Sequence, residues 1–143
     1  LYYRCMKISE NYLPYEEPTL IVVTNQEVAK IFKAHDREVD ELKILTVDTE
    51  KPQERSSGTA NSSPPDIDAI KQHSKEELYK NLNIELMRLI KEYKTITLCA
   101  PEVYKNDIVN ALHTDVKKCT GEVVPKNLAS LPLDQIIRIL KEA

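Results

Sequence analysis

Glycine is nearly missing from this chain of 143 residues, because Gly58 and Gly121 are its only two. Phosphate-binding loops of the P-loop or dinucleotide type need several glycines close together, so the sequence excludes both kinds of loop. The three cysteines, Cys5, Cys99 and Cys119, are odd in number and irregularly spaced. This pattern indicates free thiols in a reducing compartment and argues against a disulfide framework or a structural zinc site.

A strong net charge and long apolar segments are also missing. The formal net charge of −3 gives no broad basic field of the kind that general nucleic-acid binding needs. The apolar run at residues 20–23 is far too short to span a bilayer, and no charged head precedes an apolar block as in a secretion signal. We therefore expect a cytoplasmic globular protein that does not associate with a membrane.

The first half of the chain predicts a polar lead-in followed by strands. Residues 1–18 are rich in tyrosine and contain two prolines, which favours a flexible N-terminal lead-in. Residues 19–143 have the length of one domain with one core. Short apolar and β-branched runs predict strands at residues 20–24, 28–33 and 42–48. Because the connections between these strands are short, we expect an antiparallel meander.

Residues 49–73 differ in composition from both flanks. They are rich in serine, proline and charged residues and have few apolar anchors, which predicts a long mobile loop. Ser74 and Glu77 then have the spacing of a capping box, so we expect a helix to begin at Ser74. The apolar face of this helix repeats every three or four positions, at Leu78, Leu82, Leu86, Leu89 and Tyr93.

The last third of the chain alternates between strand and helix patterns. Strands are expected at residues 95–99 and 121–124, and helices are expected to open at Pro101 and after Ser130. The whole order predicts an α/β fold with a mixed five-stranded sheet, in which three antiparallel strands precede an αβαβα run. Ribonuclease H-like folds and the middle domain of archaeal and eukaryotic release factors have a similar order of elements.

The residue types at the strand ends do not suit a metal-dependent nuclease. Such an enzyme needs carboxylates that converge on two divalent metals, yet Thr24 and Asn25 end the first strand and Cys99 ends the fourth. The three histidines are not at metal-ligand spacings from one another or from a cysteine. We expect no metal, no cofactor and no catalytic residue of a recognisable type.

Short motifs in the C-terminal part resemble the host attachment protein family, which is described as required for attachment to host cells. The matching segments are Ala100-Pro101, Leu112-His113 and Lys126-Asn127-Leu128-Ala129, with Pro132 and Ile136 in register. Residues 21–25 and 29–32 resemble the early motifs of the family. The family is grouped with bacterial relatives of the archaeo-eukaryotic release factors. Departures include Asn106 and Val109, which stand where the family has glycine and arginine, so the chain resembles a divergent member.

The resemblance singles out a set of candidates for ligand or partner binding. They are Asn25, His113, Lys126 and Asn127, together with the nearby lysines Lys117 and Lys118. His113 has two interpretations, as a ligand contact at a helix end or as a structural histidine that hydrogen-bonds the next turn. The lysines also have two, as a small basic patch or as an ordinary solvated surface, because acidic residues are interleaved with them.

The resemblance to release factors implies the ribosome or tRNA as partners. In the release-factor middle domain a Gly-Gly-Gln loop assists hydrolysis of peptidyl-tRNA, and the corresponding segment here, residues 49–73, has one glycine. We therefore expect a non-enzymatic cytoplasmic binding module. Two alternatives stay open: a hydrolase that uses the loop and polar groups near His113, and a protein–protein interaction module whose loop, residues 49–73, orders on a partner.

Overall fold

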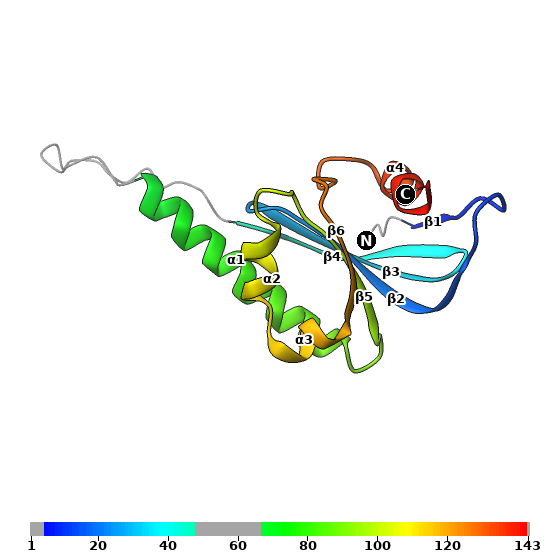
Figure 1. Cartoon of the computed structure of the whole chain (residues 1–143), viewed down its shortest axis with the longest axis horizontal. Coiled ribbons are helices and arrows are strands. Elements are labelled where there is room, and N and C mark those ends of the chain that lie inside the picture. Colours follow the sequence, from blue (N-terminus) through cyan, green and yellow to red (C-terminus); the bar gives the residue numbers. More distant parts are fainter. Residues whose placement is uncertain (1–4, 48–66, 143) are drawn as a thin grey trace, which may run out of the picture.

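The computed structural model describes residues 5–47 and 67–142. Most strands lie in the first half of the chain, and the helices lie in the second half (Figure 1). In chain order they are β1 (Cys5–Lys7), β2 (Tyr15–Thr24), β3 (Val28–Asp36), β4 (Glu38–Thr46), α1 (Ile67–Leu89), β5 (Thr95–Cys99), α2 (Lys105–Ala111), α3 (Thr114–Cys119), β6 (Thr120–Val124) and α4 (Leu133–Glu142).

The strands form one mixed sheet in the order β1-β4-β3-β2-β5-β6. The pairs among β1, β4, β3 and β2 are antiparallel, and β2–β5 and β5–β6 are parallel. The predicted mixed α/β sheet is confirmed, but the count of five strands is wrong because β1 adds a sixth. Only three residues of β1 pair with β4, and a strand this short leaves no periodicity for the sequence to display.

The expectation of a flexible lead-in over residues 1–18 is corrected from residue 5 onward. The Ile8 amide donates to the Arg37 carbonyl at 2.7 Å. The Arg37 guanidinium donates to the carbonyls of Ser9 and Tyr12, both at 2.7 Å. β2 begins at Tyr15, five residues before the apolar run that predicted it. The described part of the lead-in is therefore bound to the turn between β3 and β4, chiefly by the Arg37 guanidinium. The partners of this cation are backbone carbonyls, which the composition of the sequence does not reveal.

The central strands are buried on both faces. Leu20 and Val22 of β2 belong to the core beneath α1, whereas Ile21 and Val23 belong to the core beneath α4. Successive side chains of a strand point to opposite faces, so a run of four apolar residues supplies both cores at once. Helices α1, α2 and α3 lie on one face of the sheet and α4 on the other (Figure 1).

Helix α1 carries four of the five predicted apolar positions but starts earlier than predicted and ends at Leu89, before Tyr93. Leu78, Leu82 and Leu86 are at most 1% exposed. The helix begins at Ile67, so Ser74 lies inside it and the predicted start at a capping box is wrong. Residues 67–73 contain no proline or glycine that would stop a helix from extending backward. The predicted mobile loop over residues 49–73 is therefore helical from 67, and residues 48–66 lie outside the described part.

The segment after β5 contains two short helices where one was predicted. Residue Pro101 begins a turn, closed by the Tyr104 amide donating to the Pro101 carbonyl at 3.0 Å, and α2 starts only at Lys105. Leu112 then has an extended backbone and ends α2. Helix α3 follows from Thr114 and continues directly into β6.

Helix α4 closes the opposite face of the sheet. Leu133, Ile136 and Ile137 are buried against β2, β3 and β5 side chains in one apolar cluster. Its last turn reaches the N-terminal segment, where the Tyr12 hydroxyl donates to the Glu142 carboxylate and the Lys141 ammonium lies 3.8 Å from the centre of the Tyr15 ring. Both ends of the described chain therefore meet on the α4 face.

Candidate functional site

Three of the six predicted binding residues lie at the carboxyl ends of the parallel strands. Asn25 follows β2, and Lys126 and Asn127 follow β6. Strand β5, between them, ends at Cys99. In α/β sheets, the loops beyond the carboxyl ends of parallel strands are the common place for a ligand. The topology thus brings these three residues to one edge of the sheet, and their hydrogen bonds show what each does there.

Asn25 closes the turn between β2 and β3. Its side-chain oxygen accepts from the amides of Glu27 at 2.7 Å and Val28 at 2.9 Å, and its own amide donates to the Val28 carbonyl at 3.0 Å. An asparagine in this arrangement forms an Asx turn, and aspartate makes the same contacts. The described geometry therefore accounts for Asn25 as a turn residue.

Lys126 and Asn127 form the exposed turn between β6 and α4. The Lys126 amide donates to the Val124 carbonyl at 2.8 Å, and the Asn127 side-chain oxygen accepts from the Ala129 amide at 3.4 Å. The next residues, Leu128 and Ala129, are 3% exposed and pack beneath α4. This turn leaves the Lys126 ammonium at the surface, where it can contact an anionic partner.

His113 lies away from that edge, at the junction of α2 and α3. Its ring Nδ1 accepts from the Asp115 amide at 3.1 Å, so His113 caps the first turn of α3. The Asp115 carboxylate is 4.0 Å from the same nitrogen. As an acceptor, Nδ1 carries no proton, which places the neutral ring's N–H on Nε2. His113 therefore has the structural role of a helix cap, and half of its side chain stays exposed.

Asn83 of α1 connects this junction to the long helix. Its side-chain oxygen accepts from the His113 amide at 2.7 Å, and its side-chain nitrogen donates to the carbonyls of Ala111 at 2.8 Å and Tyr79 at 3.1 Å. One amide group therefore satisfies backbone groups at the end of α2 and the start of α3, which have no helical partners of their own. Sequence reasoning missed Asn83; its only signal was a polar residue next to an apolar helix face.

Lys117 and Lys118 lie in the last turn of α3, and both are exposed. Their positive charges lie at the helix end where the backbone dipole favours cations. Because α3 leads into the amino end of β6, these lysines and Lys126 lie at opposite ends of that strand. The predicted basic residues therefore do not form one patch.

A groove of about 760 Å³ runs along α1 beside His113. Its lining combines residues of α1 with the end of α2 and the α3 cap: Glu76, Tyr79, Lys80, Asn83, Ile84, Met87, Ala111 and His113. Ile84 is 60% exposed. Of the six predicted residues, only His113 lines this groove.

The nucleophilic groups of the core are held protonated. Burial raises the pKa of the Cys99 thiol to about 12, and the Glu122 carboxylate acts in the same direction. Burial likewise raises the pKa of Tyr79 to about 12, with Asp107 adding to the shift and Gln26 opposing it. The Tyr79 hydroxyl forms no well-aligned hydrogen bond with the described residues. Thiolate is the reactive form of cysteine, so Cys99 is inert at neutral pH.

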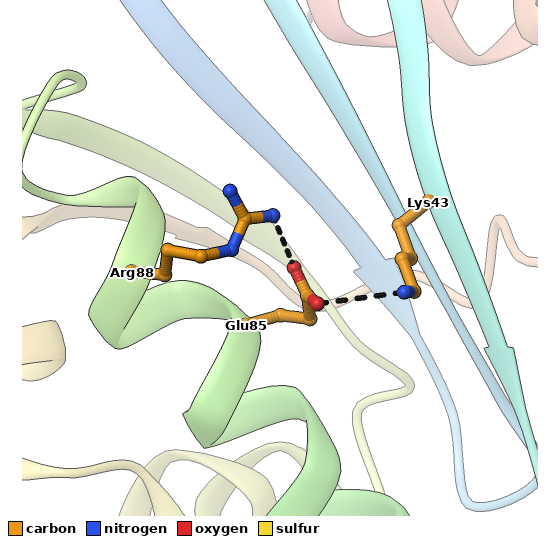
Figure 2. A network of polar contacts seen from close by, with 3 residues as sticks. All are labelled: Lys43, Glu85 and Arg88. Atoms are coloured by element: carbon orange, nitrogen blue, oxygen red, sulfur yellow. Dashed lines mark hydrogen bonds and ion pairs between the residues drawn. The ribbon is translucent and has the colours of Figure 1, made fainter.

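A second polar cluster joins α1 to β4 and is structural. The Glu85 carboxylate binds Arg88 at 2.7 Å and Lys43 at 3.5 Å (Figure 2). The hydrogen bond from Arg88 is the largest cause of a lowered pKa at Glu85, and the positive charges of Arg88 and Lys43 add to it. Lys43 comes from β4, so the cluster ties the helix to an outer strand.

The described residues contain neither a group of metal ligands nor a helix that could cross a membrane. Across 5–47 and 67–142, no three side chains among His, Cys, Asp and Glu are grouped to hold a metal ion. None of the helices described has the length and apolarity that crossing a bilayer requires.

The fold resembles part of two solved translation factors. An archaeal translation termination factor, aRF1, superposes with a TM-score of 0.53 over 75% of this chain and 29% of its own length, at 18% identity. Dom34 of S. cerevisiae, a translation termination-like factor that interacts with Hbs1, gives a TM-score of 0.52 over 90% of this chain and 34% of its own, at 17% identity. The chain thus spans about a third of these proteins, and the shared part resembles the release-factor middle domain.

The sequence itself decides the family. Residues 18–140 match bacterial archaeo-eukaryotic release factor family 12, so the chain belongs to this family. No curated protein sequence matches the chain significantly. The expected relationship to release factors is confirmed.

Proposed function

We propose that this chain is a cytoplasmic binding module that associates with the ribosome and does not itself hydrolyse peptidyl-tRNA. The observation that carries the proposal is a family match over residues 18–140 in a sequence that contains no two adjacent glycines. Glycine pairs allow a loop to adopt backbone angles closed to other residues, and the Gly-Gly-Gln loop depends on them. These 143 residues therefore combine a release-factor-like sequence with the absence of the Gly-Gly-Gln loop that serves hydrolysis in the release-factor middle domain.

The described site residues support binding more than catalysis. The side-chain oxygen of Asn25 is engaged in a turn, and Nδ1 of His113 is engaged in a helix cap. The one thiol at a parallel strand end, Cys99, is buried and held protonated. A catalytic group needs a partner that activates it within hydrogen-bond reach of the reacting atom, and none of these three has that arrangement.

Three exposed lysines are the proposed contacts with ribosomal RNA. Lys117 and Lys118 end α3, and Lys126 lies in the turn after β6. Each contact between a lysine and a phosphate releases condensed counterions, so binding through them weakens as salt rises. Because the α3 lysines and Lys126 lie at opposite ends of β6, they would contact different segments of RNA.

The resemblance to the host attachment family fits this proposal as an indirect effect. A module that acts on translation would change attachment by changing which surface proteins the cell makes. A direct role would instead require the chain itself at the cell surface.

Sedimentation through a sucrose gradient at low and moderate salt tests the association. We expect the protein to travel with ribosomes or a subunit at low salt and to be released as salt rises. A charge reversal at Lys117, Lys118 or Lys126 should lower the slope of log affinity against log salt by about 1 for each phosphate that the variant no longer neutralises. Lys7→Glu is the matched control, because Lys7 is an exposed lysine of β1. Protein that stays at the top of the gradient at every salt concentration contradicts the proposal.

A peptide-release assay tests the non-catalytic part separately. Ribosomes carrying labelled peptidyl-tRNA should retain the peptide when this protein is added in excess. Release that rises with protein concentration would favour the hydrolase alternative, and loss of that release in His113→Ala would assign it to the groups near His113.

A further inference from the structure

The groove beside α1 has an apolar floor that no described element covers. Ile84 is 60% exposed, and Met87 lies one turn further along the same side of α1, beside Ala111. Large apolar side chains are costly to leave in water, at roughly 25 cal/mol for each square ångström exposed. An exposed isoleucine within a groove of about 760 Å³ is therefore typical of a surface that a partner covers.

The walls of the groove are fixed before any partner arrives. Asn83 holds the α2–α3 junction against α1 through two hydrogen bonds, of 2.8 Å to the Ala111 carbonyl and 2.7 Å from the His113 amide. Val116 of α3 is fully buried in the core shared with Leu82 and Leu86. A preformed groove loses little conformational entropy on binding, which favours affinity.

The exposed charges nearest the apolar floor are basic. Within about one helical turn of Ile84 and Met87, the exposed charged residues are Lys80 and Arg88 of α1 and Lys91 just after it. On α3, Lys117 is four residues from His113 and so shares its side of the helix.

Each carboxylate near the groove has a polar or charged neighbour. Glu85 binds Arg88 and Lys43 (Figure 2), Glu76 accepts from Gln72 at 2.8 Å, and Asp115 lies 4.0 Å from His113. Glu76 is also two helical turns from Ile84. Within one helical turn of the apolar floor, the basic residues thus outnumber the one carboxylate, that of Glu85, and this excess favours a partner with carboxylates beside its apolar side chains.

We propose that this groove docks an acidic amphipathic helix of a partner protein. Apolar side chains spaced three or four residues apart would cover Ile84 and Met87, and carboxylates on either side would meet Lys80 and Lys91. Nucleic acid would satisfy the lysines but leave the apolar floor uncovered. This inference is independent of ribosome binding, because it concerns a different surface chemistry.

Two other occupants fit less well. In an antiparallel pairing of two copies centred on Ile84, Lys80 of one copy would face Arg88 of the other, and like charges repel. Residues 48–66 of the chain contain no Leu, Ile, Val, Met or aromatic residue that could fill the floor.

The test uses fluorescence anisotropy with the full chain and a labelled helical peptide. The peptide carries leucine at alternating spacings of three and four and glutamate at its other positions. One control peptide replaces every glutamate with lysine, and polyuridine RNA is the nucleic-acid probe. We expect the acidic peptide to bind, and Ile84→Glu to weaken it by about tenfold or more, since a central apolar anchor is removed and a carboxylate is added.

Two further variants keep the result interpretable. Lys80→Glu combined with Lys91→Glu should weaken the acidic peptide while leaving the apolar floor intact. Val103→Glu is the matched control for Ile84→Glu, because Val103 is 82% exposed and does not line the groove. It should leave binding unchanged.

Several outcomes would overturn the proposal. They are no binding of the acidic peptide, equal binding by Ile84→Glu, preference for the basic peptide, and competition by RNA at the same site. A photo-crosslinker at position 84 gives a second readout in cells that express the chain. It should label an acidic amphipathic segment of a protein, and RNA as the sole adduct would contradict the inference. Loss of ribosome association alone would leave the peptide result intact, so the two proposals fail separately.

Discussion

The two faces of the sheet are covered in different ways. On one face, the single helix α4 packs Leu133, Ile136 and Ile137 onto the sheet, and its last turn is tied to Tyr12 and Tyr15. On the other face, α1, α2 and α3 bury a larger apolar cluster but leave a groove between α1 and the end of α2. Both faces are built from the same strands, so the difference comes from the helices. The closed face contributes to stability, and the grooved face is the one on which we propose that a partner binds.

The comparison also shows how hydrogen bonds shape a surface. Asn83 holds two short helices at the side of α1, so that His113 and Ala111 form a wall beside the apolar floor of Ile84 and Met87. Had α2 and α3 been one continuous helix, the junction carrying His113 would not exist.

The largest expected effect contrasts buried with groove-lining apolar residues. Leu86→Ala beneath α1 and Ile136→Ala beneath α4 should each lower the free energy of unfolding by about 2–5 kcal/mol, because each leaves a cavity in a packed core. Both side chains are fully buried. Ile84→Ala should change it by about 0.5 kcal/mol or less, since an exposed side chain leaves no cavity. Urea unfolding followed by circular dichroism measures all three, and a large decrease for Ile84→Ala would show that the groove is part of the core.

A smaller effect tests whether Asn83 maintains the groove. Asn83→Ala should destabilise the protein by about 1–3 kcal/mol, because the Ala111 carbonyl and the His113 amide lose their partner. Asn81→Ala is the control, since Asn81 is an exposed asparagine of the same helix. Hydrogen exchange at the His113 amide should quicken in Asn83→Ala alone. Unchanged exchange there would separate the groove from this hydrogen bond.

The smallest effect concerns the ion pairs of Glu85. The pKa of Glu85 is lowered from its ordinary 4.5 in the folded protein, chiefly by the hydrogen bond from Arg88. A lowered folded-state pKa stabilises the protein above pH 4.5, and this contribution is lost as pH falls through the folded pKa. Glu85→Gln should therefore lower the free energy of unfolding at neutral pH by less than about 1 kcal/mol and flatten its decline in acid. Unfolding measured from about pH 6 to about pH 3 checks this, with Glu92→Gln as an exposed control.

Periodicity predicted the elements that are long or strongly apolar. The leucines of α1, the strand over residues 95–99 and the buried face of α4 lie as expected. The element ends were less predictable. A serine and a glutamate at capping spacing did not start α1, because nothing before them stops the helix. The division between α2 and α3 was missed, since it depends on the extended backbone at Leu112 and on Asn83 from another helix.

The candidate site shows the same division. Motif likeness selected Asn25, His113, Lys126 and Asn127, and the structure finds the first two in a turn and a helix cap and the last two in an exposed turn. Lys117 and Lys118 were named as candidates that could form a basic patch with Lys126 or an ordinary solvated surface, and they lie near the amino end of β6 while Lys126 lies at its carboxyl end. Spacing along a sequence does not report distance across a fold.

The sequence by itself determined the family, the mixed sheet and the two-sided core. It could do so because apolar period and element order are local properties that burial enforces residue by residue. It also determined that no glycine pair is present in these residues. Only the tertiary structure decided that β1 joins the sheet, that Asn83 fixes the α2–α3 junction, and that Ile84 faces a groove. Each of these depends on contacts between residues about 30 positions apart, whose partners are chosen by packing and not by neighbours in the chain.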